Sequence, residues 1–336
     1  MTSPSWPWPA GSATGIGSLP GTDVAEAQRT VLGELADLPH LAELPARGPG
    51  ADIIGRGASF LVDLPIELYA GHWRVAARPG RDLRRALDLR ERDLDQLTEQ
   101  ADGYTGPLKL QAAGVWTLAA SLDVGLGGRL IRDHGAVRDL AASLAEGLRA
   151  HLDEVRRRVP GAEPLLQLDE PLLPAALAGR LPTDSGLHTY RSVPEATARE
   201  LLGVVVDAAG APVVVHCCAA DVPLAMIRAA GAVAVAIDLD RLDRLDPLGE
   251  ALDAGMGLFA GVVPATGTPG GGRDPESAPA AERIRTLWSQ LGFAAERAAA
   301  QVVVTPACGL AGATPRYARA ALAACRDAGR RLADDQ

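Results

Sequence analysis

The sequence predicts a closed (β/α)8 barrel of the TIM type, with parallel strands. Apolar, β-branched runs alternate with helical patterns about eight times along the 336 residues, which is the pattern of parallel βαβ units. The length suits a barrel of roughly 250 residues with insertions. The distinctive polar residues come directly after predicted strands, where such a barrel carries its chemistry. A doubly wound open sheet would explain the alternation too, but it would not bring together strand ends from the whole chain.

The predicted elements follow from local patterns. Helices are expected where leucine and alanine recur at helical spacing, over residues 23–35, 81–104, 137–159, 194–209, 221–230, 246–254, 280–300 and 314–332. Strands are expected over residues 14–20, within 53–62, and over 108–114, 164–168, 213–215, 232–237, 257–263 and 301–305. Asp23 is a suitable N-cap for the first helix, and Pro194 stands at the first turn of another.

We interpret residues 1–336 as a single barrel domain with two irregular parts. Residues 1–11 form a Pro- and Trp-rich N-terminal extension, and residues 264–279 form a flexible loop rich in Gly, Pro and Thr. The loop is either a surface insertion or a lid over the barrel mouth.

Composition bounds the function. Hydrophobic residues make up 47 % of the chain and aromatics only 4 %, so the core must be built mainly from Ala, Val and Leu. A net charge of -9 argues against a nucleic-acid partner, which would need a basic face. Lys109 is the only lysine, which we interpret as coding bias. Without a signal peptide or a long apolar run, we expect a cytoplasmic protein with no membrane partner.

A motif of soft ligands follows one predicted strand. The run Val213–Val215 leads into His216, Cys217 and Cys218. Because side chains in a strand alternate between faces, His216 and Cys218 point the same way and Cys217 points opposite. The alternative is that these side chains are ordinary core residues.

Cys308, after the run 302–304, supplies a third candidate ligand. His216, Cys218 and Cys308 would form a Cys2His set with one open position, which is typical of a catalytic zinc. Two thiolates make the Zn²⁺ a weak Lewis acid, better suited to holding a substrate thiol as thiolate than to activating water. We therefore predict a zinc cofactor and S-alkylation. Four cysteines in so long a chain do not make a disulfide framework.

Three carboxylates follow predicted strands. Asp238 is a candidate fourth ligand or a hydrogen-bond partner of a ligand, the alternative being an exposed member of the acidic run 238–246. Asp169 and Glu170 close another strand and are candidates for acid–base catalysis or for binding an ammonium group. A helix N-cap is the alternative for one of the two.

A glycine-containing turn is the candidate site for a substrate carboxylate. Ile16, Gly17 and Ser18 can present successive backbone N–H groups to an anion. An ordinary turn without a ligand is the alternative.

The combination of motifs resembles the C-terminal catalytic barrel of cobalamin-independent methionine synthase. The matching stretches, in chain order, are residues 16–20, 114–118, 167–171, 216–218 and 306–310. The resemblance implies that zinc on His216, Cys218 and Cys308 binds the sulfur of homocysteine, which receives a methyl group from 5-methyltetrahydrofolate. It also implies that Asp169 binds the ammonium group and the turn 16–18 the carboxylate of homocysteine.

The chain departs from the family pattern at several points. The resemblance covers the catalytic barrel and not the family's large N-terminal domain, and the family's usual glutamate ligand is matched only by Asp238. Residues 261–267 lack the histidine that the family carries there, and Ser121 stands near the position of the folate-stacking tryptophan. Trp116 is the candidate to replace that tryptophan as a substrate-binding residue, and a corrinoid methyl donor is an alternative to folate.

The sequence therefore predicts a zinc-dependent methyltransferase acting on homocysteine or a similar thiol. Three alternatives remain: an alkyltransferase with another thiol or donor, a zinc-binding barrel without catalysis, and a metal-free decarboxylase of similar fold. The last would have no need of the cysteines.

Overall fold

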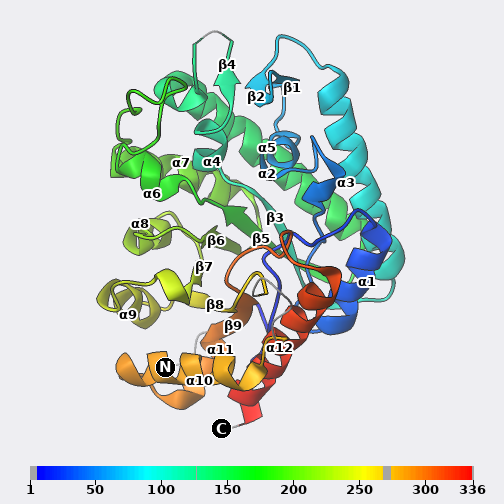
Figure 1. Ribbon diagram of the computed structural model, residues 1–336, viewed down its shortest axis with the longest axis vertical. Helices are drawn as coiled ribbons and strands as arrows, with labels where there is room; N and C mark the ends of the chain where they lie inside the picture. The colour runs from blue at the N-terminus through cyan, green and yellow to red at the C-terminus, as the bar shows by residue number, and fades with distance from the viewer. Residues whose placement is uncertain (1–5, 126, 268–273, 335–336) are drawn as a thin grey trace.

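The computed structural model describes residues 6–125, 127–267 and 274–334, and Figure 1 shows their arrangement. A curved sheet of six parallel strands forms most of a barrel, in the order β3-β5-β6-β7-β8-β9. The strands are β3 (Gly106–Ala113), β5 (Ala162–Asp169), β6 (Val213–Cys217), β7 (Ala234–Asp238), β8 (Gly257–Val263) and β9 (Val302–Pro306). Their residues are almost all buried, as expected for a parallel sheet covered by helices.

Two short extended segments close the ring. Near the N-terminus, the N–H of Thr14 donates to the carbonyl of Val304 in β9 at 3.0 Å. On the other side, the N–H of Leu41 donates to the carbonyl of Lys109 in β3, also at 3.0 Å. Because Ser18 bridges Glu43, the two segments also pair with each other. The predicted TIM-type barrel is thereby confirmed, with its first two strands reduced to isolated bridges.

Helices surround the sheet in the order expected from the sequence (Figure 1). They are α1 (Val24–Glu34), α2 (Ile53–Ala58), α3 (Arg81–Gln100), α4 (Val115–Ala119), α5 (His134–Arg158), α6 (Leu173–Leu177), α7 (Glu195–Ala208), α8 (Leu224–Ala229), α9 (Asp246–Asp253), α10 (Ser277–Gln290), α11 (Ala295–Gln301) and α12 (Pro315–Asp334). Short 3-10 turns lie at η1 (Pro45–Arg47), η2 (Leu130–Arg132) and η3 (Leu239–Arg241). As predicted, the Asp23 carboxylate caps α1 by accepting from the N–H of Glu26.

Two local predictions are wrong. The segment within 53–62 is not extended, because the Asp52 carboxylate caps α2 by accepting from the N–H of Gly55 at 2.8 Å. Gly57 lets this helix lie against β3, since a Cβ there would come within 2.7 Å of the Ala113 methyl. The expected helix 280–300 is two helices, because Gly292 adopts a φ of +72° between α10 and α11.

A small second sheet lies beside α3. It contains β1 (Ile66–Tyr69), β2 (His72–Val75) and β4 (Asp123–Val124). The first two form an antiparallel hairpin, and β4 pairs with β2. This sheet was not predicted, because each strand is too short to show a period.

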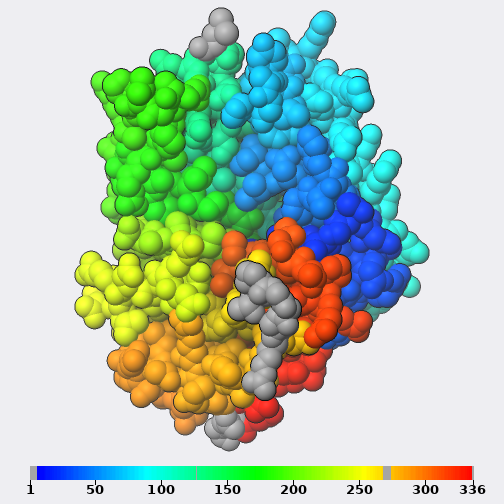
Figure 2. Space-filling model, in the orientation of Figure 1, coloured from blue at the N-terminus to red at the C-terminus, as the bar shows by residue number. Residues whose placement is uncertain are grey.

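The N-terminal segment packs under the barrel core. The Trp8 indole donates to the carbonyl of Ala300 at 3.1 Å and meets the Phe259 ring edge-on at 5.1 Å. Residues 1–5 of the expected extension 1–11, and residues 268–273 of the expected loop 264–279, lie outside the described residues. Figure 2 shows N-terminal and C-terminal residues side by side on one face, as the closed ring requires. Within the described ranges, none of the helices is long and apolar enough to cross a membrane.

Candidate functional site

Three predicted metal ligands converge at the carboxyl ends of β6 and β9. One ligand atom each of His216, Cys218 and Cys308 lies within 4.8 Å of the others. The Cys308 Sγ is 3.9 Å from the His216 Nε2. Zn–S bonds of about 2.3 Å and Zn–N bonds of about 2.0 Å place tetrahedral ligand atoms roughly 3.5–3.8 Å apart. The donor set therefore fits one zinc ion after small side-chain adjustments.

The backbone orients the His216 ring. Its Nδ1 lies 3.1 Å from the carbonyl of Ala236 on the neighbouring strand, which leaves Nε2 directed at the cysteines. A hydrogen bond from the other ring nitrogen is the usual way to fix a metal-binding histidine. Burial disfavours its charged form, but the hydrogen bond to Cys308 and the nearby Asp169 outweigh burial and raise the pKa of His216.

A hydrogen bond links the half-buried side chains of Cys218 and Cys308. A hydrogen bond from the Cys218 thiol, followed by one from His216, lowers the pKa of Cys308 to about 4. The same hydrogen bond, together with burial, raises the pKa of Cys218. A low pKa at Cys308 favours the thiolate form, which is the form that binds a metal. Cys217 is fully buried outside this group, consistent with strand alternation.

Asp238 does not join the three ligands. Its carboxylate caps η3 by accepting from the N–H of Asp240 at 2.9 Å, and it lies 3.4 Å from the Arg241 Nε. The structure thus brings together three of the four predicted ligands and holds the fourth in a local turn.

The turn 16–18 lies against the Cys308 loop. The N–H of Leu310 donates to the carbonyl of Ser18 at 2.8 Å, and a Cβ on Gly309 would come within 2.1 Å of the Ser18 hydroxyl. Gly309 is therefore required for this close approach. The predicted carboxylate-binding turn thus lies beside the loop that carries Cys308.

Asp169 is paired with His216 across strands β5 and β6. Its Oδ1 accepts from the Gln167 Nε2 at 2.7 Å, and the same amide group donates to the carbonyl of Ile16 at 2.8 Å. Burial raises the pKa of Asp169 to about 7, with nearby His216 opposing that rise. Asp169 is thus tied to the turn through one side chain.

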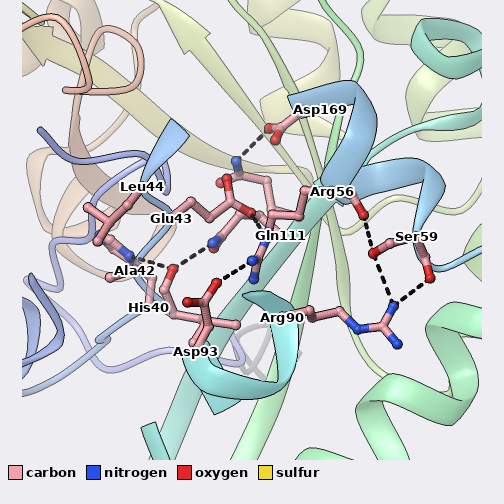
Figure 3. Close-up of polar contacts among 12 residues, drawn as sticks. His40, Ala42, Glu43, Leu44, Arg56, Ser59, Arg90, Asp93, Gln111 and Asp169 are labelled. Carbon is pink, nitrogen blue, oxygen red and sulfur yellow. Dashed lines mark hydrogen bonds and ion pairs between the residues drawn. The ribbon is translucent and has the colours of Figure 1, made fainter. Parts of the chain in front are cut away.

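Glu43 is a site residue that the sequence did not reveal. Its backbone pairs with the turn 16–18, and its carboxylate accepts from the Arg56 Nε at 2.9 Å. Its charge is among the causes that raise the pKa of Asp169. Figure 3 shows the polar network that joins Glu43 and Arg56 to Asp93 and lies beside Asp169. Position 43 does not come directly after a predicted strand, so the sequence pattern gave no reason to select it.

Glu170 is fully buried and has a structural task. Its carboxylate accepts from the N–H of Trp116 at 2.9 Å and from the N–H and hydroxyl of Thr117 at 2.8 and 2.9 Å. It thereby accepts from the first turn of α4, although the N-cap residue of that helix is Gly114 and Glu170 comes from a different part of the chain. Burial outweighs these bonds and raises the pKa of Glu170 to about 7.

Trp116 does not face the predicted site. Its side chain is buried, and the indole N–H donates to the carbonyl of Ala198 in α7 at 3.1 Å. A separate cavity of about 630 Å³ lies by Ser121, lined also by Trp73, Asp52 and Arg129. The Trp73 indole donates to the Asp52 carboxylate at 3.1 Å. An aromatic residue of the small sheet thus lies near the position where the family carries tryptophan.

Comparison with known proteins decides the family. The family model described as cobalamin-independent synthase, catalytic domain, matches residues 11–331. The chain belongs to this family. The synthase-family barrel is also found in a B12-independent methionine synthase from Shewanella sp. W3-18-1, solved in complex with selenomethionine. The two share 11 % identity at a TM-score of 0.62, over 97 % of this chain and 98 % of that one.

More distant barrels carry less information. A dihydrodipicolinate synthase from Oceanobacillus iheyensis shares 12 % identity at a TM-score of 0.41, over 97 % of this chain and 76 % of that one. That likeness carries no argument about function. No curated protein sequence matches the chain.

Proposed function

We propose that this synthase-family chain is a zinc-dependent S-methyltransferase whose acceptor is homocysteine or a similar amino-acid thiol. One observation carries the proposal. The ligand atoms of His216, Cys218 and Cys308 lie within 4.8 Å of one another, beside a turn and a carboxylate suited to an amino acid.

Different residues would bind the thiol end and the amino-acid end of the substrate. His216, Cys218 and Cys308 would hold zinc, which when bound keeps a substrate thiol deprotonated near neutral pH. The carboxylates of Asp169 and Glu43 would bind the substrate ammonium group. The turn Ile16–Ser18 would bind the substrate carboxylate through backbone N–H groups. The sulfur would then attack the methyl carbon in line, forming an S–C bond as the donor bond breaks.

Two observations favour a second candidate that differs only in the donor. Residues 261–267 contain no histidine that could protonate a departing folate nitrogen. Trp116 is buried against α7, so it does not provide a stacking surface for a pterin. A methyl-corrinoid needs neither group.

The proposal is tested in two stages. Metal analysis should find about one zinc per chain, as one Cys2His site predicts, and zinc-edge X-ray absorption should show one additional sulfur ligand when homocysteine is added. Methylation of homocysteine is then assayed with 5-methyltetrahydrofolate and, separately, with methylcobalamin. Zinc without an added sulfur ligand would overturn the proposal and leave a metal-binding barrel without thiol chemistry.

A further inference from the structure

Lys109, the only lysine of the chain, lies inside the barrel. Its side chain is fully buried. Burying an ammonium group is costly unless acceptors surround it. Its Nζ donates to the carbonyl of Ile16 at 2.9 Å, to the Gln167 Oε1 at 2.8 Å and to the Gln111 Oε1 at 3.3 Å. An ammonium has three donors, so all of them are used.

Each of these acceptors leads to a different part of the proposed amino-acid pocket. Ile16 begins the turn proposed for the substrate carboxylate. Gln167 donates to Asp169, proposed for the ammonium group, and also to the same Ile16 carbonyl. Gln111 donates to the carbonyl of Leu41 at 2.6 Å, in the segment that carries Glu43.

Packing makes these links rigid. A Cβ on Gly17 would come within 2.8 Å of the Gln111 side chain, so the turn rests directly on that glutamine. Figure 3 shows Gln111 beside Glu43 and near Asp169. No mobile surface group takes part, because Lys109, Gln111 and Gln167 are all buried.

We propose that Lys109 is a positioning residue that holds the turn 16–18, Asp169 and the Glu43 segment in the geometry of an amino-acid pocket. This inference rests on the proposed function and deepens it, because it attributes the preference for an amino-acid thiol over a simple thiol to the network around Lys109. Lys109 acts through Gln167 and Gln111 and does not touch the metal ligands. Burial lowers the pKa of Lys109 to about 7, while the nearby charges of Asp169 and Glu43 oppose that fall.

The substitution Lys109→Met tests the proposal, because methionine fills similar space without charge or donors. Two thiols are titrated by calorimetry into the zinc-loaded protein: homocysteine, which has both charged groups, and propanethiol, which has neither. We expect the Lys109→Met protein to keep its zinc, to bind homocysteine at least about tenfold more weakly, and to bind propanethiol within about twofold of the wild type.

Gln301→Met provides a matched control. Gln301 is equally buried and donates to the carbonyls of Leu252 and Met256, away from the pocket. This variant should retain the homocysteine preference. Equal weakening of both thiols by Lys109→Met, or no weakening, would overturn the positioning role.

A second variant covers the case in which Lys109→Met does not fold. Gln167→Leu leaves the lysine in place but removes the bridge to Asp169 and Ile16. It should show the same selective loss of homocysteine affinity, and its failure to do so would count against the proposal. If the wild type itself binds propanethiol but does not prefer homocysteine, the proposed function fails instead.

Discussion

The candidate site has two halves that hold their side chains in different ways. The metal half consists of His216, Cys218 and Cys308, and the amino-acid half of the turn 16–18 and Asp169 with the buried residues that contact them. In the metal half, the Cys308 Sγ lies 3.9 Å from the His216 Nε2. In the amino-acid half, Lys109, Gln167 and Asp169 are joined by bonds of 2.7–2.8 Å. The ligand atoms of the first half would be joined through a bound ion, whereas the side chains of the second are hydrogen-bonded directly to one another. Affinity for metal and affinity for substrate should therefore respond to different substitutions.

The largest effect is expected in the metal half. Cys308→Ser should abolish zinc binding and reduce methyl transfer by at least about 1000-fold, because a serine hydroxyl is a poor zinc ligand and stays protonated. Metal analysis and the homocysteine assay measure both effects. Cys217→Ala is the matched control, since that thiol is buried outside the ligand group. If the Cys308→Ser protein retains one zinc per chain, Cys308 is not a zinc ligand and the proposed metal half is wrong.

The next largest effect is expected on the stability of a Glu170 variant, and it distinguishes a structural role of Glu170 from a catalytic one. Glu170→Ala leaves two backbone N–H groups and one hydroxyl without their acceptor. We expect the free energy of unfolding to fall by about 3 kcal/mol, measured by urea titration. Thr98→Ala removes a half-exposed hydroxyl bonded within its own helix and should cost far less. A Glu170→Ala protein of unchanged stability but without activity would instead assign Glu170 to catalysis.

A smaller, pH-dependent effect is expected in the amino-acid half. Burial and the nearby Lys109 lower the pKa of His40 from 6.5 to about 3. The unfolded chain therefore binds a proton that the folded chain excludes, so stability falls as pH decreases below 6.5. Between pH 7 and pH 5 this loss is about 2 kcal/mol.

Replacing the buried imidazole tests that sign. His40→Asn keeps a donor for the carbonyl of Leu41 but cannot titrate. Urea unfolding of this variant should lose about 2 kcal/mol less than the wild type between pH 7 and pH 5. The exposed His72→Asn should behave like the wild type. An identical pH dependence in His40→Asn would show that this imidazole is not excluded from protonation.

The smallest effect is expected on zinc affinity when Asp238 is replaced, and it tests whether Asp238 belongs to the metal half. Because its carboxylate caps η3, Asp238→Asn should weaken zinc binding by less than about tenfold. Competition with a zinc chelator measures this change. A loss as large as that of Cys308→Ser would identify Asp238 as the fourth ligand, reached after η3 rearranges.

The barrel strands and the individual metal ligands could be predicted because each ligand stands at or after a run with a clear local pattern, and the barrel itself brings the strand ends together. Buried runs such as 213–215 have a clear apolar signal, and strand alternation separates Cys218 from Cys217. Glu43 and the role of Lys109 could not be predicted in this way. Their meaning comes from contacts between segments far apart in the chain, and a lone lysine in an arginine-rich sequence carries no local signal. Trp116 was assigned to the substrate because sequence proximity does not reveal which face of α4 a side chain occupies.

The closure of the ring has a kinetic consequence. Thr14 meets Val304 only after nearly the whole chain has been synthesised, and Cys308 follows in the same loop. Contacts this distant in sequence form slowly. We therefore expect zinc capture during refolding to share the rate constant of the slowest structural phase, as followed by a zinc dye and by circular dichroism. Capture that precedes this phase would show that the ligands assemble in an open sheet. If zinc capture and the slowest phase share one rate constant, a bound zinc ion marks a molecule in which the first and last strands have paired.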